Sequence, residues 1–359
     1  MRRVATYVFA VVTLILGVAN ATAQELRLGV DFTTLFDNKE YAGMTIDESG
    51  TLFSARLTPK VGVAWSERNE LMFAVDMVQD FGHDAKFLSD ANVQLYYAFR
   101  APRVTVLAGI FPRSEMRGLS TPLFFDRDYR YYHNRIGGVL ARYEDPSFDG
   151  SYVEFAMDYT GMRDFDTREA FMIMSSGQMP IRWFYLGYDL MMGHYAKDYN
   201  PETIDGVVDN IFVVPYVGWD FGVGGFDVDL RLSYIQSLQR DRINEHRWEA
   251  PCGGEFYAAI SRWGVTLSNL LYLGGNLLTY YNRYGDALYH GVPFYATTKH
   301  IYDAITASYA HGFFSDTVSV AAGITAEYDG TRWGTRQWLQ VAVDLDYGIS
   351  LKRKTQYVE

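Results

Sequence analysis

The last long run before the C-terminal tail shows a pattern that recurs along the chain. From Leu339 to Lys352, large apolar side chains alternate with polar or small ones. This two-residue period is typical of a β-strand that has one face against an apolar phase and the other against water. Because a tilted strand needs roughly 9–11 such residues to cross a bilayer, we interpret the run as a membrane strand.

Similar runs follow one another, and the connections between them are short and long in turn. The alternation is clear at 226–236 and 318–328 and weaker at 170–176, 256–262 and 301–313. The pattern predicts an all-β protein, a transmembrane antiparallel β-barrel of about 16 strands (about 14 to 18). Its turns would be short on the periplasmic side and its loops long outside. A soluble periplasmic sandwich or propeller would have shorter strands, of about 5–6 residues.

The start of the chain has the features of an export signal. Arg2 and Arg3 precede an apolar run at 8–18 and the small residues Ala-Thr-Ala at 21–23, which is a typical signal peptide with its cleavage site. We therefore expect residues 1–23 to be removed and 24–359 to form the barrel. No later apolar run approaches the roughly 18 residues of a helical span, so the barrel pattern predicts the outer membrane of a Gram-negative-type bacterium.

Composition agrees with a sheet protein in a membrane. The 28 Tyr and 23 Phe suit strands and the aromatic belts at two membrane interfaces. With 32 Lys and Arg against 43 Asp and Glu, the net charge of −11 argues against nucleic acid as a partner. Cys252 is the one cysteine and forms no internal disulfide. No His or Cys spacing resembles a metal site, so we expect no metal and no cofactor.

The architecture as a whole resembles that of bacterial outer-membrane porins, although no short motif ties it to one porin family. The resemblance rests on the signal peptide, the amphipathic strands, the alternating connections and a long third outer loop at about 112–135. It implies that this loop folds into the barrel and narrows it. Outer-membrane lipid and small hydrophilic solutes would be the partners, and a homo-oligomer, a trimer, is possible. The charged C-terminal tail departs from the usual strand-final aromatic.

Two groups of residues are candidates for solute selection. The expected pore constriction lies in and beside the third outer loop, where basic residues outnumber acidic ones: Arg113, Arg117, Asp126, Arg127, Arg130, Tyr131 and Arg135. The expected lumen wall follows from the alternation: Arg56, Lys60, Asp76, Arg100, Asp158, Asp227, Asp229, Arg231, Asp344 and Asp346. Rings of one sign of charge select ions of the other sign. The alternative is that these charges pair locally and that the loop aromatics only pack.

We interpret the chain as a porin-like channel for passive diffusion of small hydrophilic solutes, with sugars as one class. A non-conducting surface-binding or adhesive barrel is the first alternative, and an outer-membrane barrel hydrolase the second. Histidines such as His83, His246 and His290 occur in or beside the expected outer loops, but no G-x-S-x-G nucleophile motif accompanies them. The expectation is therefore that the protein is not an enzyme.

Overall fold

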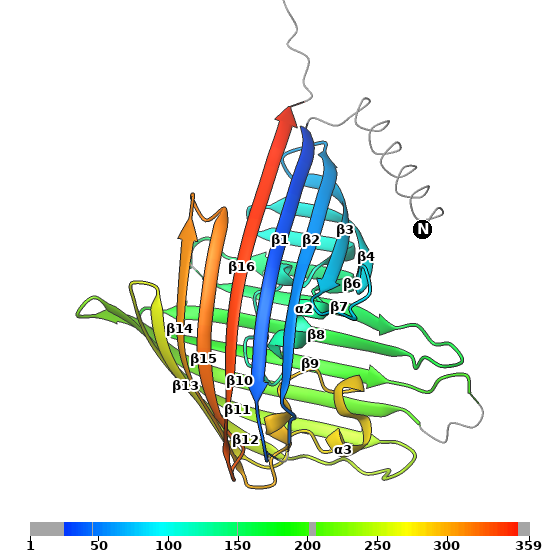
Figure 1. Cartoon of the computed structure of the whole chain (residues 1–359), viewed down its shortest axis with the longest axis vertical. Helices are drawn as coiled ribbons and strands as arrows, with labels where there is room; N and C mark the ends of the chain where they lie inside the picture. Colours follow the sequence, from blue (N-terminus) through cyan, green and yellow to red (C-terminus); the bar gives the residue numbers. More distant parts are fainter. Residues whose placement is uncertain (1–24, 45, 149, 201–205, 351–359) are drawn as a thin grey trace, which may run out of the picture.

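A single closed antiparallel barrel is seen in the computed structural model, which describes residues 25–44, 46–148, 150–200 and 206–350. The described residues form sixteen strands, each paired with its neighbours in sequence, and β1 closes the barrel against β16 (Figure 1). The predicted fold class and strand number are confirmed. The expected signal peptide at 1–23 lies outside the described residues.

The strands run from β1 to β16 with few interruptions by helix. Their bounds are β1 (Glu25–Glu40), β2 (Gly50–Ala64), β3 (Asn69–Asp80), β4 (Asp90–Ala101), β5 (Val104–Pro112), β6 (Arg135–Glu144), β7 (Tyr152–Gly161), β8 (Ala170–Ile181), β9 (Phe184–Tyr195), β10 (Val208–Val223), β11 (Phe226–Asp241), β12 (Cys252–Arg262), β13 (Val265–Gly274), β14 (Ile301–Phe313), β15 (Val318–Tyr328) and β16 (Trp333–Ser350). Short helices α2 (Arg127–Tyr132) and α3 (Tyr281–Tyr284) lie in two of the loops.

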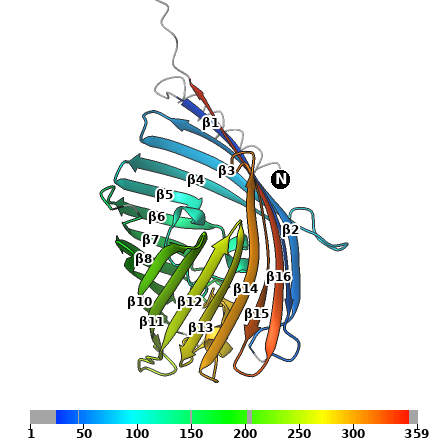
Figure 2. The same ribbon diagram turned by 90° about the vertical axis from the view of Figure 1, so that its left-hand side faces the viewer.

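The connections differ between the two ends of the barrel. Two-residue turns such as 102–103 and 263–264 join strands at the end where β1 begins and β16 ends, whereas the loops 113–134 and 275–300 leave the other end. With the short turns on the periplasmic side, as in single-chain outer-membrane barrels, the long loops are extracellular. Figure 2 shows the strands from a second side.

Two prolines lie inside strands, where their lack of an N–H is a disadvantage. Pro59 of β2 is paired with Val30 of β1, but the ladder between β2 and β3 skips it. Pro215 of β10 is paired with Tyr188 of β9, and the ladder with β11 skips it. Each strand therefore continues through its proline, and the pairing with only one of the two neighbouring strands is interrupted there.

The strand alternation separates an inner from an outer surface. In β7, Glu154, Ala156 and Asp158 are buried, whereas Val153 and Phe155 between them are exposed. A wall that faces lipid requires such large apolar side chains on its outer surface. In the described part of the chain, no helix is long and apolar enough to cross a membrane.

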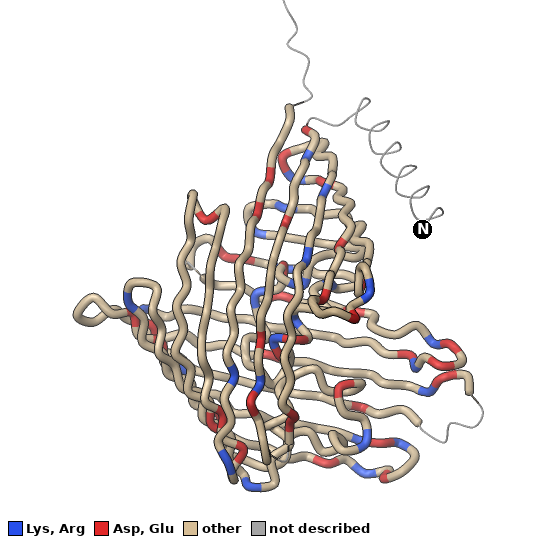
Figure 3. Tube along the Cα trace, viewed as in Figure 1, with Lys and Arg blue, Asp and Glu red and all other residues tan. Residues whose placement is uncertain are grey.

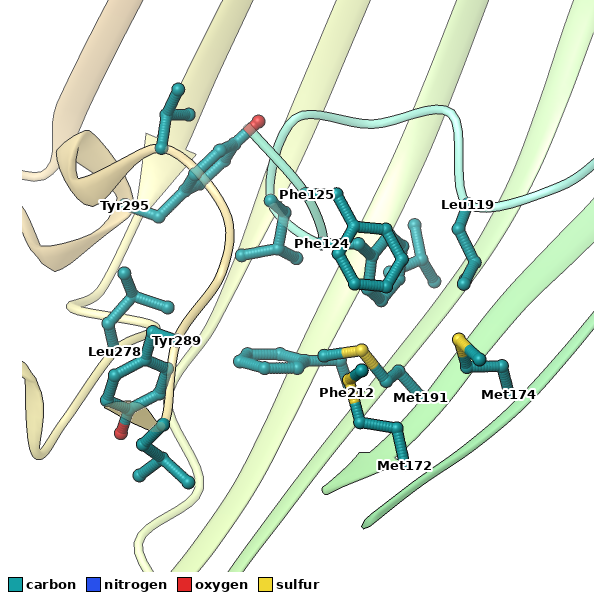
Figure 4. Close-up of a cluster of buried hydrophobic side chains, with 14 of the residues drawn as sticks. Leu119, Phe124, Phe125, Met172, Met174, Met191, Phe212, Leu278, Tyr289 and Tyr295 are labelled. Atoms are coloured by element: carbon teal, nitrogen blue, oxygen red, sulfur yellow. The ribbon is translucent and has the colours of Figure 1, made fainter. Parts of the chain in front are cut away.

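The barrel interior holds an apolar core made by two loops. The loops 113–134 and 275–300 enter the barrel and pack on each other and on the wall, and we call this filling the septum. In Figure 4, Phe124 and Phe125 lie above Phe212 and the methionines of the wall, with Tyr289 and Tyr295 beside them. Burial of these side chains stabilises both loops inside the lumen.

Hydrogen bonds between the two loops complete the septum. The backbone N–H of Val292 donates to the carbonyl of Pro122 at 2.9 Å, and that of Asp126 donates to the carbonyl of His290 at 2.7 Å. A β-carbon on Gly291 would overlap the carbonyl oxygen of Leu123, so only glycine permits this approach. The loops therefore form one unit inside the barrel.

Candidate functional site

The third outer loop begins at a buried ion pair with the barrel wall. A guanidinium nitrogen of Arg113, Nη2, lies 2.5 Å from a carboxylate oxygen of Asp158, and both side chains are almost fully buried. The Arg113 guanidinium also donates to the carbonyls of His133 and Arg135, each at 2.9 Å. These bonds join the first and last residues of the loop, so they fix the loop where it enters the lumen.

Other wall carboxylates bind the backbone of the loop. Glu154 accepts from the N–H groups of Arg117 and Gly118 at 2.9 and 2.7 Å. Asp189 accepts from the N–H of Leu119 at 2.9 Å. These wall carboxylates therefore satisfy main-chain donors of the loop, whereas Asp158 pairs with a loop arginine.

The remaining constriction candidates take different positions. Arg117 pairs with Glu144 at 2.7 Å, and its side chain is 47% exposed. Arg127 lies over the Trp338 ring at 3.8 Å from the centroid. Arg130 donates to the carbonyl of Leu119 at 2.6 Å, within its own loop.

The last two constriction candidates lie on opposite sides of the septum. Tyr131 is buried against Arg56 at 4.6 Å, whereas Arg135 lines the outer of two cavities described below. The constriction candidates are therefore spread over both sides of the septum and do not form one ring.

A network of charges that was not predicted from the sequence anchors helix α2. Arg336 of β16 lies 2.7 Å from Asp37, 2.8 Å from Asp126 and 2.8 Å from Asp128. Lys39 adds ion pairs to Asp126 and Asp128 at 3.6 and 3.1 Å. Burial opposes ionisation of Asp126, but Arg336 and Lys39 together keep its pKa below the usual value. The inward positions of Lys39 and Arg336 in their strands were the signal that could have found them.

Several of the expected wall residues also pair locally. Arg56 lies 3.5 Å from Asp76 in the lumen wall. Arg100 binds Glu70 at 3.2 Å and Glu115 at 2.7 Å. These pairs follow the alternative that the wall charges neutralise one another across strands.

Near the periplasmic mouth, the wall is acidic. Lys60 faces three carboxylates, with Asp31 at 2.7 Å, Asp346 at 3.0 Å and Asp344 at 3.8 Å. Figure 3 marks the acidic and basic residues along β1, β2 and β16 that include this group.

The other acidic wall candidates lie on β11. Asp229 accepts from the Tyr185 hydroxyl at 2.8 Å, and Asp227 is exposed. On the same strand, Arg231 donates to the Ser120 hydroxyl at 2.6 Å and lies 3.8 Å from Glu255.

Two cavities lie on either side of the septum. The outer one, of about 840 Å³, reaches residues of five extracellular loops, and the inner one, of about 880 Å³, lies between the septum and the wall strands toward the periplasm. Arg113 and Asp126 line both. Arg113 and Asp126 therefore mark the place where the two cavities approach each other.

The two cavities differ in the charges that line them. Apart from the shared pair, the described lining residues of the outer cavity include six acidic and three basic ones: Asp47, Asp128, Asp158, Asp166, Asp198 and Asp286, and Lys39, Arg135 and Arg168. The inner cavity has two acidic and five basic ones: Asp31 and Glu327, and Arg56, Arg117, Arg127, Arg130 and Arg336. Negative charge therefore prevails outside the septum and positive charge inside it.

Stacked rings form the floor of the outer cavity. Tyr129 lies between His133 and His290, with ring centroids 4.5 and 4.3 Å apart and the rings nearly parallel. Burial, then the nearby Arg113, lowers the pKa of His133, and the same causes lower the pKa of His290 to about 3. Both imidazoles are therefore neutral at physiological pH.

The aromatic residues of the seventh outer loop pack against neighbouring segments. Tyr280, Tyr284 and Tyr289 are buried, and the Tyr289 hydroxyl donates to the Gln239 side chain at 2.5 Å. Their part in filling the lumen was not predicted, since the partner residues lie far away in sequence.

A polar cluster lies on the outer surface at the extracellular rim. The Thr51 hydroxyl donates to Asn38 at 2.6 Å, and the Asn38 amide donates to Gln337 at 2.8 Å. Asn38 lies next to the buried Asp37 in β1, so it points outward, just beyond the paired rings of Phe36 and Phe53. Among the described residues, no group of three or more His, Cys, Asp or Glu could hold a metal ion.

Solved structures with the same fold are outer-membrane proteins. OccK8 (OprE) of Pseudomonas aeruginosa matches with a TM-score of 0.54 at 7% identity, over 90% of this chain and 98% of that one. OccK11 (OpdR) of the same organism matches with a TM-score of 0.53 at 8% identity, over 90% and 96%. A loop L8 deletion mutant of OmpT from Vibrio cholerae matches with a TM-score of 0.51 at 10% identity, over 89% and 99%.

At these identities the likeness shows the fold alone, and it confirms the porin-like architecture. No curated protein sequence matches the chain significantly. A family model described as lipid A 3'-O-deacylase-type matches residues 18–203, more than half of the chain. The expectation that the protein is not an enzyme is wrong, because this family is a family of enzymes. The chain belongs to the lipid A 3'-O-deacylase-type family.

Proposed function

We propose that the barrel is a narrow outer-membrane conduit through which small hydrophilic solutes diffuse. The observation that carries this proposal is that Arg113 and Asp126 line both cavities. A solute would pass from the outer to the inner cavity beside these two charged residues. Barrels of about sixteen strands are wide enough to hold an aqueous channel.

The proposed route is narrow because the septum fills much of the lumen. Each cavity falls within the roughly 300–1,000 Å³ range of small-molecule sites. At the boundary, Arg113 is held by Asp158 and Asp126 by Arg336. A polar solute can exchange hydrogen bonds with these groups as it passes, whereas an apolar solute would leave them unpaired. A homo-oligomer stays a prediction.

Solute release from vesicles tests the conduit. The mature protein is folded into phosphatidylcholine vesicles loaded with labelled polyols and sugars of increasing size. We expect release of the smallest solutes and retention of the larger ones. Retention of every solute by vesicles that contain heat-modifiable, folded protein would overturn the proposal. Protein-free vesicles give the background leak.

Ester hydrolysis on outer-leaflet lipid is a second candidate, favoured by family membership and by the rim cluster. Thr51, Asn38 and Gln337 place a hydroxyl and two amides on the lipid-facing surface, where they would meet the ester linkages and headgroup of a lipid such as lipid A. Hydroxyl and amide groups are suitable for a nucleophile and for stabilising an oxyanion.

Mass spectrometry of lipid A incubated with the folded protein tests this candidate. Loss of an acyl chain with wild type, abolished by Thr51→Val and by Asn38→Ala, would support it. Arg247→Gln is the matched control, since Arg247 lies in a loop and pairs only with Glu249 among the described residues. An unchanged lipid mass with every protein would exclude this activity on lipid A, and loss of the chain in both rim variants would exclude the rim cluster as its site.

A further inference from the structure

The two cavities present opposite charge along the proposed route. Outside the septum, six acidic lining residues exceed three basic ones; inside it, five arginines exceed two acidic residues. A neutral solute is not attracted by the net charge of either cavity. A simple anion is disfavoured in the outer cavity and a simple cation in the inner one, because charge rings favour only the opposite sign.

Some arginines that line the inner cavity have N–H groups without a hydrogen-bond partner among the described residues. The Nη2 of Arg56 and the Nη1 of Arg113 are buried and have no hydrogen-bond partner among the described residues. The Arg117 side chain is 47% exposed. Unsatisfied guanidinium N–H groups bind carboxylates well because their charge and geometry match.

Acidic groups in the outer cavity are also open to a ligand. Asp166 and Asp286 line it and are exposed, and among the described residues neither has an ion pair; Asp286 accepts a hydrogen bond from the Tyr281 hydroxyl at 3.4 Å. The histidines in its floor add no positive charge at neutral pH, since burial lowers the pKa of both. An ammonium group would therefore be attracted there.

We propose that the conduit selects dipolar solutes, with the ammonium end against the outer-cavity carboxylates and the carboxylate end against the inner-cavity arginines. Such a solute bridges the septum at the residues shared by both cavities, Arg113 and Asp126. Beyond the arginines, the three carboxylates around Lys60 make the periplasmic mouth acidic again. An ammonium group that has passed the arginines is attracted to that mouth, which completes the transfer. This inference rests on the proposed conduit.

Four solutes with the same carbon skeleton differ in charge but hardly in size. The dipolar solute is 4-aminobutyrate and the cation is 4-aminobutanamide. The anion is 4-hydroxybutyrate and the neutral solute is 4-hydroxybutanamide. Uptake of each labelled solute is measured in phosphatidylcholine vesicles clamped at zero potential in low salt. We expect the dipolar solute to enter about fivefold faster than the neutral one, a ratio typical of weak coupling energies. The preference should decline in high salt as the charges are screened.

Variants then identify the charges responsible. Arg117→Gln with Arg127→Gln should lower uptake of the dipolar solute and the anion but not of the cation. Asp166→Asn with Asp286→Asn should lower uptake of the dipolar solute and the cation but not of the anion. Arg247→Gln, a loop variant outside both cavities, should change none of them.

The outcomes separate this inference from the conduit itself. Equal uptake of all four solutes, or fastest uptake of the anion or of the cation, would overturn dipolar selection and leave the conduit in place. No uptake of any solute by folded protein would overturn both. A preference for the dipolar solute that survives all the charge variants would also contradict the inference, because the named residues would not be its cause.

Discussion

A β-carbon on Gly291 would overlap the carbonyl oxygen of Leu123, so the two loops of the septum meet backbone against backbone. These residues come from the seventh and third extracellular loops, and the neighbouring Val292 and Pro122 are joined by a main-chain hydrogen bond of 2.9 Å. The backbones of the two loops therefore leave no room for a side chain at this contact.

The first prediction concerns this contact. Gly291→Ala should force the loops apart at a cost of about 1–3 kcal/mol, as overpacking does, and should raise the release rate of the smallest solutes from vesicles. Gly50→Ala is the control, since a β-carbon there meets no atom within 4 Å. Equal release rates for the two variants would show that the contact does not limit the lumen.

The second prediction concerns the buried pair at the start of the third loop. Asp158→Asn should leave Arg113 charged and buried without its partner, and should lower the free energy of unfolding by about 3 kcal/mol. Urea unfolding in lipid vesicles, followed by tryptophan fluorescence, measures the change. The control Arg247→Gln removes an exposed ion pair and should change stability by less than about 1 kcal/mol.

The third prediction concerns pH. The lowered pKa of His290, about 3, and that of His133 mean that the unfolded chain binds protons below about pH 6.5 that the folded protein does not. Stability should therefore fall as pH decreases through this window, by up to about 1.4 kcal/mol per pH unit for each histidine.

The variant His133→Gln with His290→Gln should remove this part of the pH dependence. Urea unfolding at pH 7 and pH 5 gives the difference for both proteins. Between pH 7 and pH 5, the free energy of unfolding should fall less in the variant than in wild type. An identical decrease in both proteins would mean that the stacked histidines do not cause the acid sensitivity.

The fourth prediction concerns the anchor of α2. Arg336→Gln removes three ion pairs, with Asp37, Asp126 and Asp128, and leaves these carboxylates close together. We expect α2 to leave the wall, so that Lys39 and its neighbours become accessible. Faster amide hydrogen exchange in residues 126–133 with unchanged exchange in β10 is the expected result; unchanged exchange in both would contradict it.

The barrel followed from the sequence because its signal is local. Residues 339–352 display inward and outward faces without reference to any other segment, and the same holds for most strands. The septum is different, since Leu123 and Gly291 are far apart in sequence and their approach depends on tertiary packing. The third loop was a candidate through its length, whereas the entry of the seventh loop into the lumen was not predicted.

Individual charges were harder to predict than their general location. The alternation placed Asp158 and Arg56 in the lumen, but it does not say which partner each will meet. Glu154 and Asp189 bind loop N–H groups, a use that no side-chain pattern reveals. The enzymatic family was missed because no local nucleophile motif marks it.

Single-channel recording in planar bilayers tests the conduit most directly. The folded wild-type protein should give small, stable steps of current, and Gly291→Ala should give larger steps at the same salt concentration and voltage. A membrane that stays silent with both proteins, although each is folded and heat-modifiable, would contradict the account of this barrel as a conduit.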